Sequence, residues 1–126
     1  MRILVVDDEP QVLEPLVDLL AVFGYRCTPM SDPHEAADFC ATHDFDLAIV
    51  DYSMPGMDGL ELARRIRSVS PGTPVVILTA FGETFFRRQE REPEVAAVLQ
   101  KPVGSLHLRA VIQRVVPSEP RGSKES

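Results

Sequence analysis

Polar side chains capable of chemistry follow four short apolar runs in this sequence of 126 residues. They are Asp7 and Asp8 after Ile3–Val6, Asp51 after Leu47–Val50, Thr79 after Val75–Leu78, and Lys101 shortly after Val95–Leu99. Carboxylates about 4 Å apart repel by roughly 1 kcal/mol in water and about 4 kcal/mol at an effective dielectric near 20, so a cluster of them needs a cation. Carboxylate and water ligands favour Mg²⁺ over zinc or copper. A dication beside a carboxylate and an ammonium is suited to phosphoryl transfer, in which Asp51 could serve as a nucleophile that forms an acyl phosphate.

The apolar runs have the length of β-strands. Those at Ile3–Val6, Leu47–Val50 and Val75–Leu78 are nearly unbroken, which is typical of parallel strands covered on both faces. Tyr25–Met30 and Val95–Leu99 complete a predicted set of five strands.

Segments with helical spacing separate the strands, and the predicted helices span 10–23, 33–43, 59–69, 82–92 and 104–116. Asp32 and Asp58 are predicted N-caps because an acidic residue follows each three positions later. Pro15 lies inside the first helix, where it is expected to bend or delay that helix.

Alternation of strands and helices over residues 1–116 predicts one α/β domain. The expected fold is a doubly wound, five-stranded parallel sheet of order 2-1-3-4-5, flanked by helices. In such folds the functional site lies at the carboxyl ends of the strands. Residues 117–126 have no apolar anchor and are predicted to be a disordered tail or the start of a linker.

Composition narrows the possible functions. Lysine and arginine number 13 and aspartate and glutamate 19, so the net charge of −6 leaves no broad basic face for nucleic acid. The two cysteines are too few for a disulfide framework or a four-ligand zinc site, and they suit a reducing cytoplasm. No apolar run is long enough for a membrane span, which needs roughly 18 residues or more. The expectation is a soluble, acidic, cytoplasmic protein.

Each candidate residue also has an ordinary structural interpretation. The acidic segment Asp7–Pro10 could cap the first helix, and Asp51 could be a turn residue. Thr79 could be a β-branched residue at a strand end, and Lys101 an exposed lysine. Their joint position at the ends of different strands favours a common site.

The motifs that contain these residues resemble the receiver domain of two-component response regulators, over about residues 1–116. They are Val5-Val6-Asp7-Asp8-Glu9, the segment Asp51–Gly59, Thr79-Ala80 and Lys101-Pro102. The resemblance implies the flavodoxin-like receiver fold. It also implies that Asp51 accepts a phosphoryl group from a phosphohistidine on a sensor histidine kinase or a histidine phosphotransfer protein.

The resemblance further assigns roles around Asp51. It implies Mg²⁺ bound directly by Asp8 and Asp51, through water by Asp7, and by the backbone carbonyl of Ser53. Lys101 would pair with one phosphoryl oxygen. The remaining implied pocket residues are Thr79, which would bind a second oxygen and act in switching, Ala80, and the two positions that tune phosphoryl lifetime, Ser53 and Phe81. The Lys101-Pro102 bond resembles one that is usually cis.

The sequence departs from the family pattern on the expected output face, formed by the fourth helix, fifth strand and fifth helix. The family usually has an aromatic switch residue three positions before the lysine, where this sequence has Val98. The predicted helix over 82–92 is highly charged, which fits either a solvated, self-paired face or a customised docking surface. We also hypothesise that Phe81 shields the acyl phosphate from water.

Three functions compete with a phosphoacceptor that catalyses its own phosphorylation and dephosphorylation without being a conventional enzyme. The first is phosphorylation-independent docking. The second is an aspartate-nucleophile phosphatase, which needs an acid where Ser53 stands. The third is nucleotide or flavin binding, which needs a glycine-rich loop after the first strand. The downstream partner is expected to be a protein or an output domain outside this chain, and homodimerisation is left open.

Overall fold

The structure is a computed structural model that describes residues 1–80 and 93–116. Its elements in chain order are β1 (Arg2–Val6), α1 (Pro10–Val22), β2 (Arg26–Met30), α2 (Pro33–Cys40), β3 (Leu47–Asp51), α3 (Gly59–Val69), β4 (Val75–Thr79), β5 (Ala97–Gln100) and α5 (Ser105–Val115). The helix predicted over 82–92 and the tail predicted over 117–126 lie outside the described residues, and the domain boundary at residue 116 stays a prediction. Among the described residues, no helix has the length and apolar character that crossing a membrane requires.

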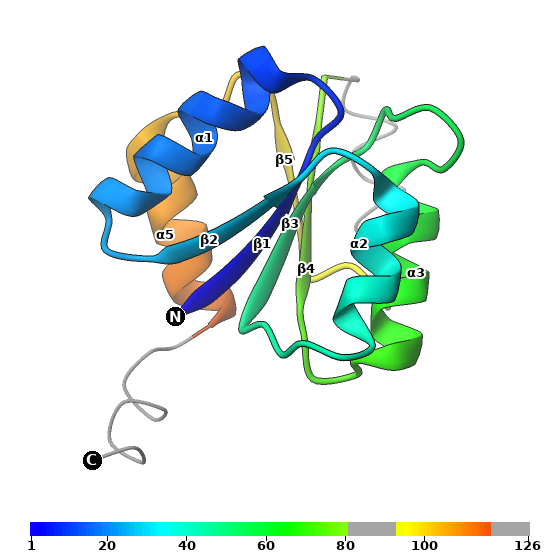
Figure 1. Ribbon diagram of the computed structural model, residues 1–126. Helices are drawn as coiled ribbons and strands as arrows, with labels where there is room; N and C mark the ends of the chain where they lie inside the picture. The colour runs from blue at the N-terminus through cyan, green and yellow to red at the C-terminus, as the bar shows by residue number, and fades with distance from the viewer. Residues whose placement is uncertain (81–92, 117–126) are drawn as a thin grey trace, which may run out of the picture.

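The five strands form one parallel sheet in the order β2-β1-β3-β4-β5, which confirms the predicted topology. Helices α1 and α5 cover one face of the sheet, and α2 and α3 cover the other (Figure 1). In the register, Val6 of β1 pairs with Val50 of β3, and Asp51 pairs with Leu78 of β4. Because the strands run in the same direction, the residues at their carboxyl ends lie along one edge of the sheet.

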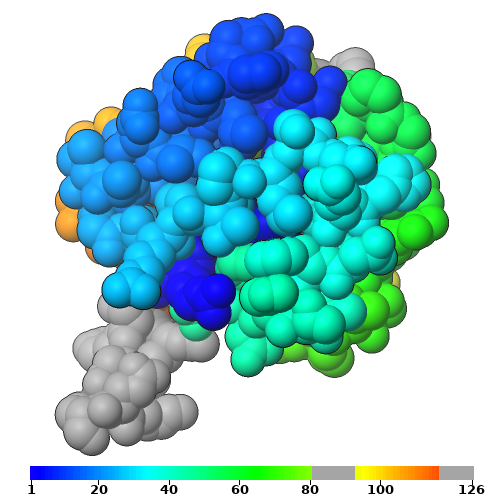
Figure 2. All heavy atoms as spheres, viewed as in Figure 1, coloured from blue at the N-terminus to red at the C-terminus, as the bar shows by residue number. Residues whose placement is uncertain are grey.

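Each sheet face packs into its own apolar core, which explains why the strand sequences are apolar without alternation. In β1, Leu4 and Val6 lie in the core beneath α2 and α3, whereas Ile3 and Val5 lie in the core beneath α1 and α5. Little of β1 is visible between α1 and α2 in the space-filling view (Figure 2). Both cores hold the sheet, and with it the polar strand ends, in a fixed frame.

Local signals set the starts of two helices. The Asp32 carboxylate accepts a hydrogen bond from the His34 N–H at 2.9 Å, and Asp58 accepts one from the Glu61 N–H at 2.8 Å. Both predicted N-caps are confirmed. Such caps stabilise a helix by satisfying backbone donors that have no partner in the first turn.

The largest differences from the predicted boundaries are at the end of the second helix and at the start of the fifth strand. The second helix ends at Cys40 instead of residue 43, and β5 begins at Ala97, after Val95, because its pairing with β4 starts at Val76. Helix α1 starts at Pro10 and continues through Pro15, so its start is not delayed. Pro15 lies in the exposed part of this helix, where the loss of one backbone donor is tolerated.

Candidate functional site

Asp51, Lys101 and Asp7 meet at the carboxyl edge of the sheet. Asp51 is the last residue of β3, and its Oδ1 lies 2.5 Å from the Lys101 Nζ. The same ammonium lies 3.6 Å from Asp7 Oδ2. Both carboxylates are buried and Lys101 is partly exposed, so the ion pairs are largely shielded from solvent.

Asp8 joins these residues in a compact acidic cluster. One carboxylate oxygen from each of Asp7, Asp8 and Asp51 lies within 4.8 Å of the other two. Among residues 1–80 and 93–116, Lys101 supplies the ion pairs to this cluster, so one positive charge faces three negative ones. At such separations the mutual repulsion of the carboxylates is about 1–4 kcal/mol per pair, which a bound cation would relieve.

Asp7 gives independent support for a cation. Its Oδ1 accepts a hydrogen bond from the Glu9 N–H at 3.0 Å, which fixes the carboxylate. The buried Oδ2 has no hydrogen-bond partner among the described residues, and Lys101 Nζ lies 3.6 Å from it. A buried carboxylate oxygen without such a partner is costly. The ligand atoms that Asp7, Asp8 and Asp51 offer are all hard carboxylate oxygens, so these residues fit Mg²⁺.

The acidic segment provides the N-cap position of the first helix, but its side chains do not cap that helix. The N-cap of α1 is Glu9, and no side chain in the described part of the chain makes a capping hydrogen bond there. The aspartates of this segment instead take part in the cluster at the sheet edge.

A cavity of about 240 Å³ opens beside the cluster. It is lined by Asp8, Glu9, Asp51, Ser53, Thr79, Ala80 and Lys101. The sequence predicts all of these as site residues except Glu9, whose only signal is its position directly after the two aspartates. Phe81 lies outside the described residues, so its shielding role stays a hypothesis.

Backbone contacts tie the last two strand ends together. The Lys101 N–H donates to the Thr79 carbonyl at 2.7 Å, and Thr79 is buried. The Lys101-Pro102 peptide bond is cis, as expected. These contacts place the lysine beside the threonine at the wall of the cavity.

Val98 lies away from the cavity. Its side chain is 2% exposed and belongs to the apolar core beneath α2 and α3. The structure therefore places a small, buried side chain where the resemblance implies an aromatic residue that moves.

Burial and neighbouring charges shift the pKa values of Asp51 and Lys101. Burial raises the pKa of Asp51 above its ordinary value; the hydrogen bond from Lys101 opposes this rise, and the charges of Asp7 and Asp8 add to it. Burial lowers the pKa of Lys101, but the hydrogen bond and charge of Asp51, with the charge of Asp7, outweigh burial, so the pKa is raised overall. Lys101 is therefore stabilised as a cation, whereas ionisation of Asp51 is less favourable in the folded protein than in water.

We expect Asp51→Asn to raise the unfolding temperature at pH 7 in Mg²⁺-free buffer. A carboxyl whose pKa is raised by folding stabilises the fold below its ordinary value of 3.8, and this stabilisation is lost as the pH rises through the raised pKa. The amide removes that loss. Thermal unfolding with and without Mg²⁺ checks this expectation: Mg²⁺ should stabilise the wild type more than the variant. A variant that unfolds at a lower temperature than the wild type without Mg²⁺ would contradict it.

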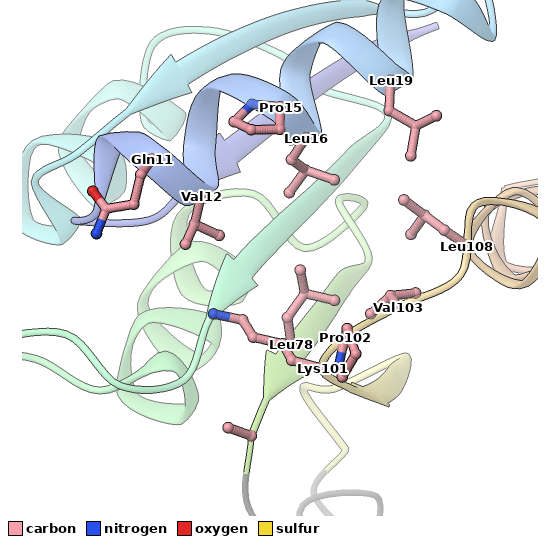
Figure 3. Close-up of a pocket in the computed structure, with 11 residues that line it drawn as sticks. Gln11, Val12, Pro15, Leu16, Leu19, Leu78, Lys101, Pro102, Val103 and Leu108 are labelled. Atoms are coloured by element: carbon pink, nitrogen blue, oxygen red, sulfur yellow. The ribbon is translucent and has the colours of Figure 1, made fainter.

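A second, larger cavity of about 640 Å³ lies between α1 and the start of α5 (Figure 3). Leu16, Leu19 and Leu108 point into this space from the two helices (Figure 3). We call it the α1–α5 groove; it is lined by Gln11, Val12, Pro15, Leu16, Leu19, Leu78, Ala80, Lys101, Pro102, Val103 and Leu108. Ala80 and Lys101 line both cavities, so the groove adjoins the polar site.

Comparison with known proteins assigns the class to which this fold and site belong. Residues 3–113 match the family model of the response regulator receiver domain. The chain belongs to this family, the receiver domains of two-component response regulators.

Individual relatives are also response regulators or receiver domains. The response regulator MprA of Mycolicibacterium vanbaalenii is 34% identical over 126 residues, covering 97% of this chain and 54% of that protein. A receiver domain protein from Clostridium thermocellum has a TM-score of 0.85 and 26% identity, covering 94% of this chain and 96% of that one. The chain spans about half the length of the curated relative.

One related structure bears on the metal. The receiver domain of a sensor histidine kinase from Pseudomonas aeruginosa has a TM-score of 0.83 and 28% identity, covering 93% of this chain and 98% of that one. That protein has a magnesium ion coordinated in its active site cleft.

Proposed function

We propose that this receiver domain accepts a phosphoryl group on Asp51 in a Mg²⁺-dependent reaction and that its phosphodonor is a phosphohistidine of a partner protein. The observation that carries the proposal is the meeting of three carboxylates and one ammonium beside a small open cavity. The donor protein belongs to the class of sensor histidine kinases or histidine phosphotransfer proteins.

In the proposed reaction, an Asp51 carboxylate oxygen forms a bond to phosphorus as the bond between phosphorus and the donor imidazole nitrogen breaks. The nitrogen keeps the bonding electron pair and takes up a proton. Asp8 and Asp51 would hold Mg²⁺ directly, with Asp7 acting through water and the Ser53 carbonyl as a further ligand. The bound ion would supply neutralisation of the phosphoryl charge.

The remaining pocket residues take positions around the phosphoryl group. Lys101 already lies 2.5 Å from Asp51, so its ammonium can pair with a phosphoryl oxygen attached there. Thr79 and Ala80 line the same cavity, and the Thr79 hydroxyl is proposed to bind a second oxygen. The added charge and this hydroxyl would together change a protein-binding surface.

Trapping of the covalent product tests the proposal. After incubation with acetyl phosphate and Mg²⁺, borohydride reduces an aspartyl phosphate to homoserine, which peptide mapping locates. We expect homoserine at position 51 only. Its absence from position 51 would contradict the proposal and favour phosphorylation-independent docking, the second candidate, which the buried Val98 supports by making a conventional output switch unavailable.

The α1–α5 groove is the surface that we propose the phosphodonor protein contacts. Ala80 and Lys101 line both the cavity at Asp51 and the groove, so a protein that brings a histidine to Asp51 past these two residues would also cover the adjoining apolar surface. The exposed acidic residues Glu14 and Asp18 of α1 favour a partner with basic side chains around an apolar contact.

We expect Pro15→Glu to slow transfer from a phosphohistidine protein by about 10-fold while leaving labelling by acetyl phosphate unchanged, because a charge in an apolar contact costs more than 1 kcal/mol. Pro15 is exposed and lines the groove, so the core is not disturbed. Val22→Glu is the matched control, since Val22 is 81% exposed on the same helix and does not line the groove. Equal rates of transfer to Pro15→Glu and Val22→Glu would contradict the proposal that the phosphodonor protein contacts the groove.

A further inference from the structure

The chain between Asp51 and α3 returns to contact its own starting point. The Gly59 N–H donates to the Tyr52 carbonyl at 2.8 Å, and the Tyr52 hydroxyl donates to Asp58 Oδ2 at 3.4 Å. Asp58 also caps α3 through its Oδ1. The first turn of α3 is thus fastened to the residue that directly follows Asp51.

Gly59 makes this contact possible because it has no side chain. A Cβ at this position would lie 2.7 Å from the Asp51 carbonyl oxygen and 2.8 Å from the Tyr52 Cα. These distances are shorter than real Cβ contacts, and the atoms concerned belong to the backbone, so they cannot rotate away. Any side chain here must push α3 and the end of β3 apart.

We infer that Asp58 and Gly59 are positioning residues for the phosphoacceptor, an inference that rests on the proposed function. The Gly59 hydrogen bond holds the peptide between Tyr52 and Ser53, and Asp58 holds the Tyr52 side chain. The close approach of Gly59 to the Asp51 carbonyl limits where the preceding peptide, between Asp51 and Tyr52, can lie, and this peptide is attached to the residue whose side chain is the phosphoacceptor. The Ser53 carbonyl, a proposed metal ligand, is attached one residue further along the same segment. Neither residue contacts the phosphoryl group in this account.

The spacing of the cluster makes it sensitive to a small backbone shift. Asp51 Oδ1 lies 2.5 Å from Lys101 Nζ, and the three carboxylate oxygens lie within 4.8 Å of one another. Metal coordination tolerates changes of only about 0.2 Å, and a displacement of about 1 Å at a reacting group can cost about 100-fold in rate. A Cβ at position 59 would lie 2.7 Å from the Asp51 carbonyl oxygen, and relief of that contact would displace Asp51. We expect this displacement to be large enough to change both Mg²⁺ binding and the reaction rate.

The test compares Gly59→Ala with Gly72→Ala. Gly72 is the matched control because a Cβ there meets no atom of the described residues within 4 Å and its φ is not positive. We expect Gly59→Ala to weaken Mg²⁺ binding, measured by calorimetry, by about 10- to 100-fold and to slow labelling by acetyl phosphate to a similar degree. The Gly72 variant should match the wild type in both.

Both variants are measured at a temperature at which circular dichroism shows them folded, since loss of stability alone would not change the Mg²⁺ affinity of folded molecules. Unchanged affinity and labelling in folded Gly59→Ala would overturn the inference while leaving the proposed function intact. Failure of the wild type to bind Mg²⁺ or to be labelled would instead overturn the proposed function.

If Gly59→Ala does not fold, Asp58→Ala decides the question, because it removes the contact with Tyr52 without adding atoms. We expect about 3- to 10-fold weaker Mg²⁺ binding. Asp32→Ala is its control, since Asp32 is also a helix N-cap but precedes α2, which does not follow β3. Equal Mg²⁺ affinities in the two aspartate variants would overturn the inference.

Discussion

Asp51→Asn is expected to abolish phosphorylation, with a fall of at least about 1,000-fold, the order found when a covalent nucleophile is removed. The amide is a poor nucleophile, and it cannot carry the negative charge that pairs with Lys101 at 2.5 Å. The measurement is the amount of acid-stable, hydroxylamine-sensitive label after incubation with labelled acetyl phosphate and Mg²⁺.

Asp44→Asn is the control for this variant. Asp44 is exposed and precedes β3 at the opposite end of the strand from Asp51, so its loss should leave labelling unchanged. Substantial labelling of Asp51→Asn would mean that another side chain receives the phosphoryl group.

Asp8→Asn is expected to reduce the labelling rate at limiting Mg²⁺ by at least about 100-fold, since loss of a direct metal ligand exceeds the 10- to 100-fold effects of residues that only support ligands. The carboxylate oxygen of Asp8 lies within 4.8 Å of those of Asp7 and Asp51, where it can share one cation. A titration of labelling rate against Mg²⁺ concentration measures the effect.

The dependence of the labelling rate on Mg²⁺ concentration distinguishes loss of a metal ligand from loss of the nucleophile. Raised Mg²⁺ should recover part of the rate in Asp8→Asn, but it should recover none in Asp51→Asn. Asp44→Asn, the exposed change before β3, again serves as the control. A rate for Asp8→Asn that equals the wild-type rate at every Mg²⁺ concentration would exclude Asp8 as a metal ligand.

The sheet and the main site residues could be predicted from sequence because the signals are local and strong. Runs such as Leu47–Val50 are too apolar for an exposed strand, so they require helices on both faces. Because the predicted strands are parallel, the residues at their carboxyl ends must lie along the same edge of the sheet. The sequence therefore brings Asp7, Asp51 and Lys101 together before any coordinates are known.

Features that depend on packing could not be predicted in this way. The close contact at Gly59 arises where α3 crosses the end of β3, and no residue type in the sequence specifies that distance. The α1–α5 groove depends on how far α1 stands from α5. The start of β5 at Ala97 reflects its pairing with β4, because Val95 is buried but lies before the paired residues.

Val98 illustrates the limit of the resemblance for output. The sequence shows that the usual aromatic side chain is missing, and the structure shows that the valine is enclosed in the core beneath α2 and α3. A buried valine offers no ring to move between exposed and buried positions. Val98 therefore cannot act as the aromatic switch residue that the resemblance implies at this position.

The most direct test of the central claim is the intact mass of the protein after incubation with acetyl phosphate. The claim is that Asp7, Asp8 and Asp51 hold a dication that allows Asp51 to attack phosphorus. Wild type and Asp51→Asn are each measured with Mg²⁺ and with a chelator. The account predicts the added mass of one phosphoryl group in the wild type with Mg²⁺ alone; an equal gain in the chelator, or in Asp51→Asn, would contradict it.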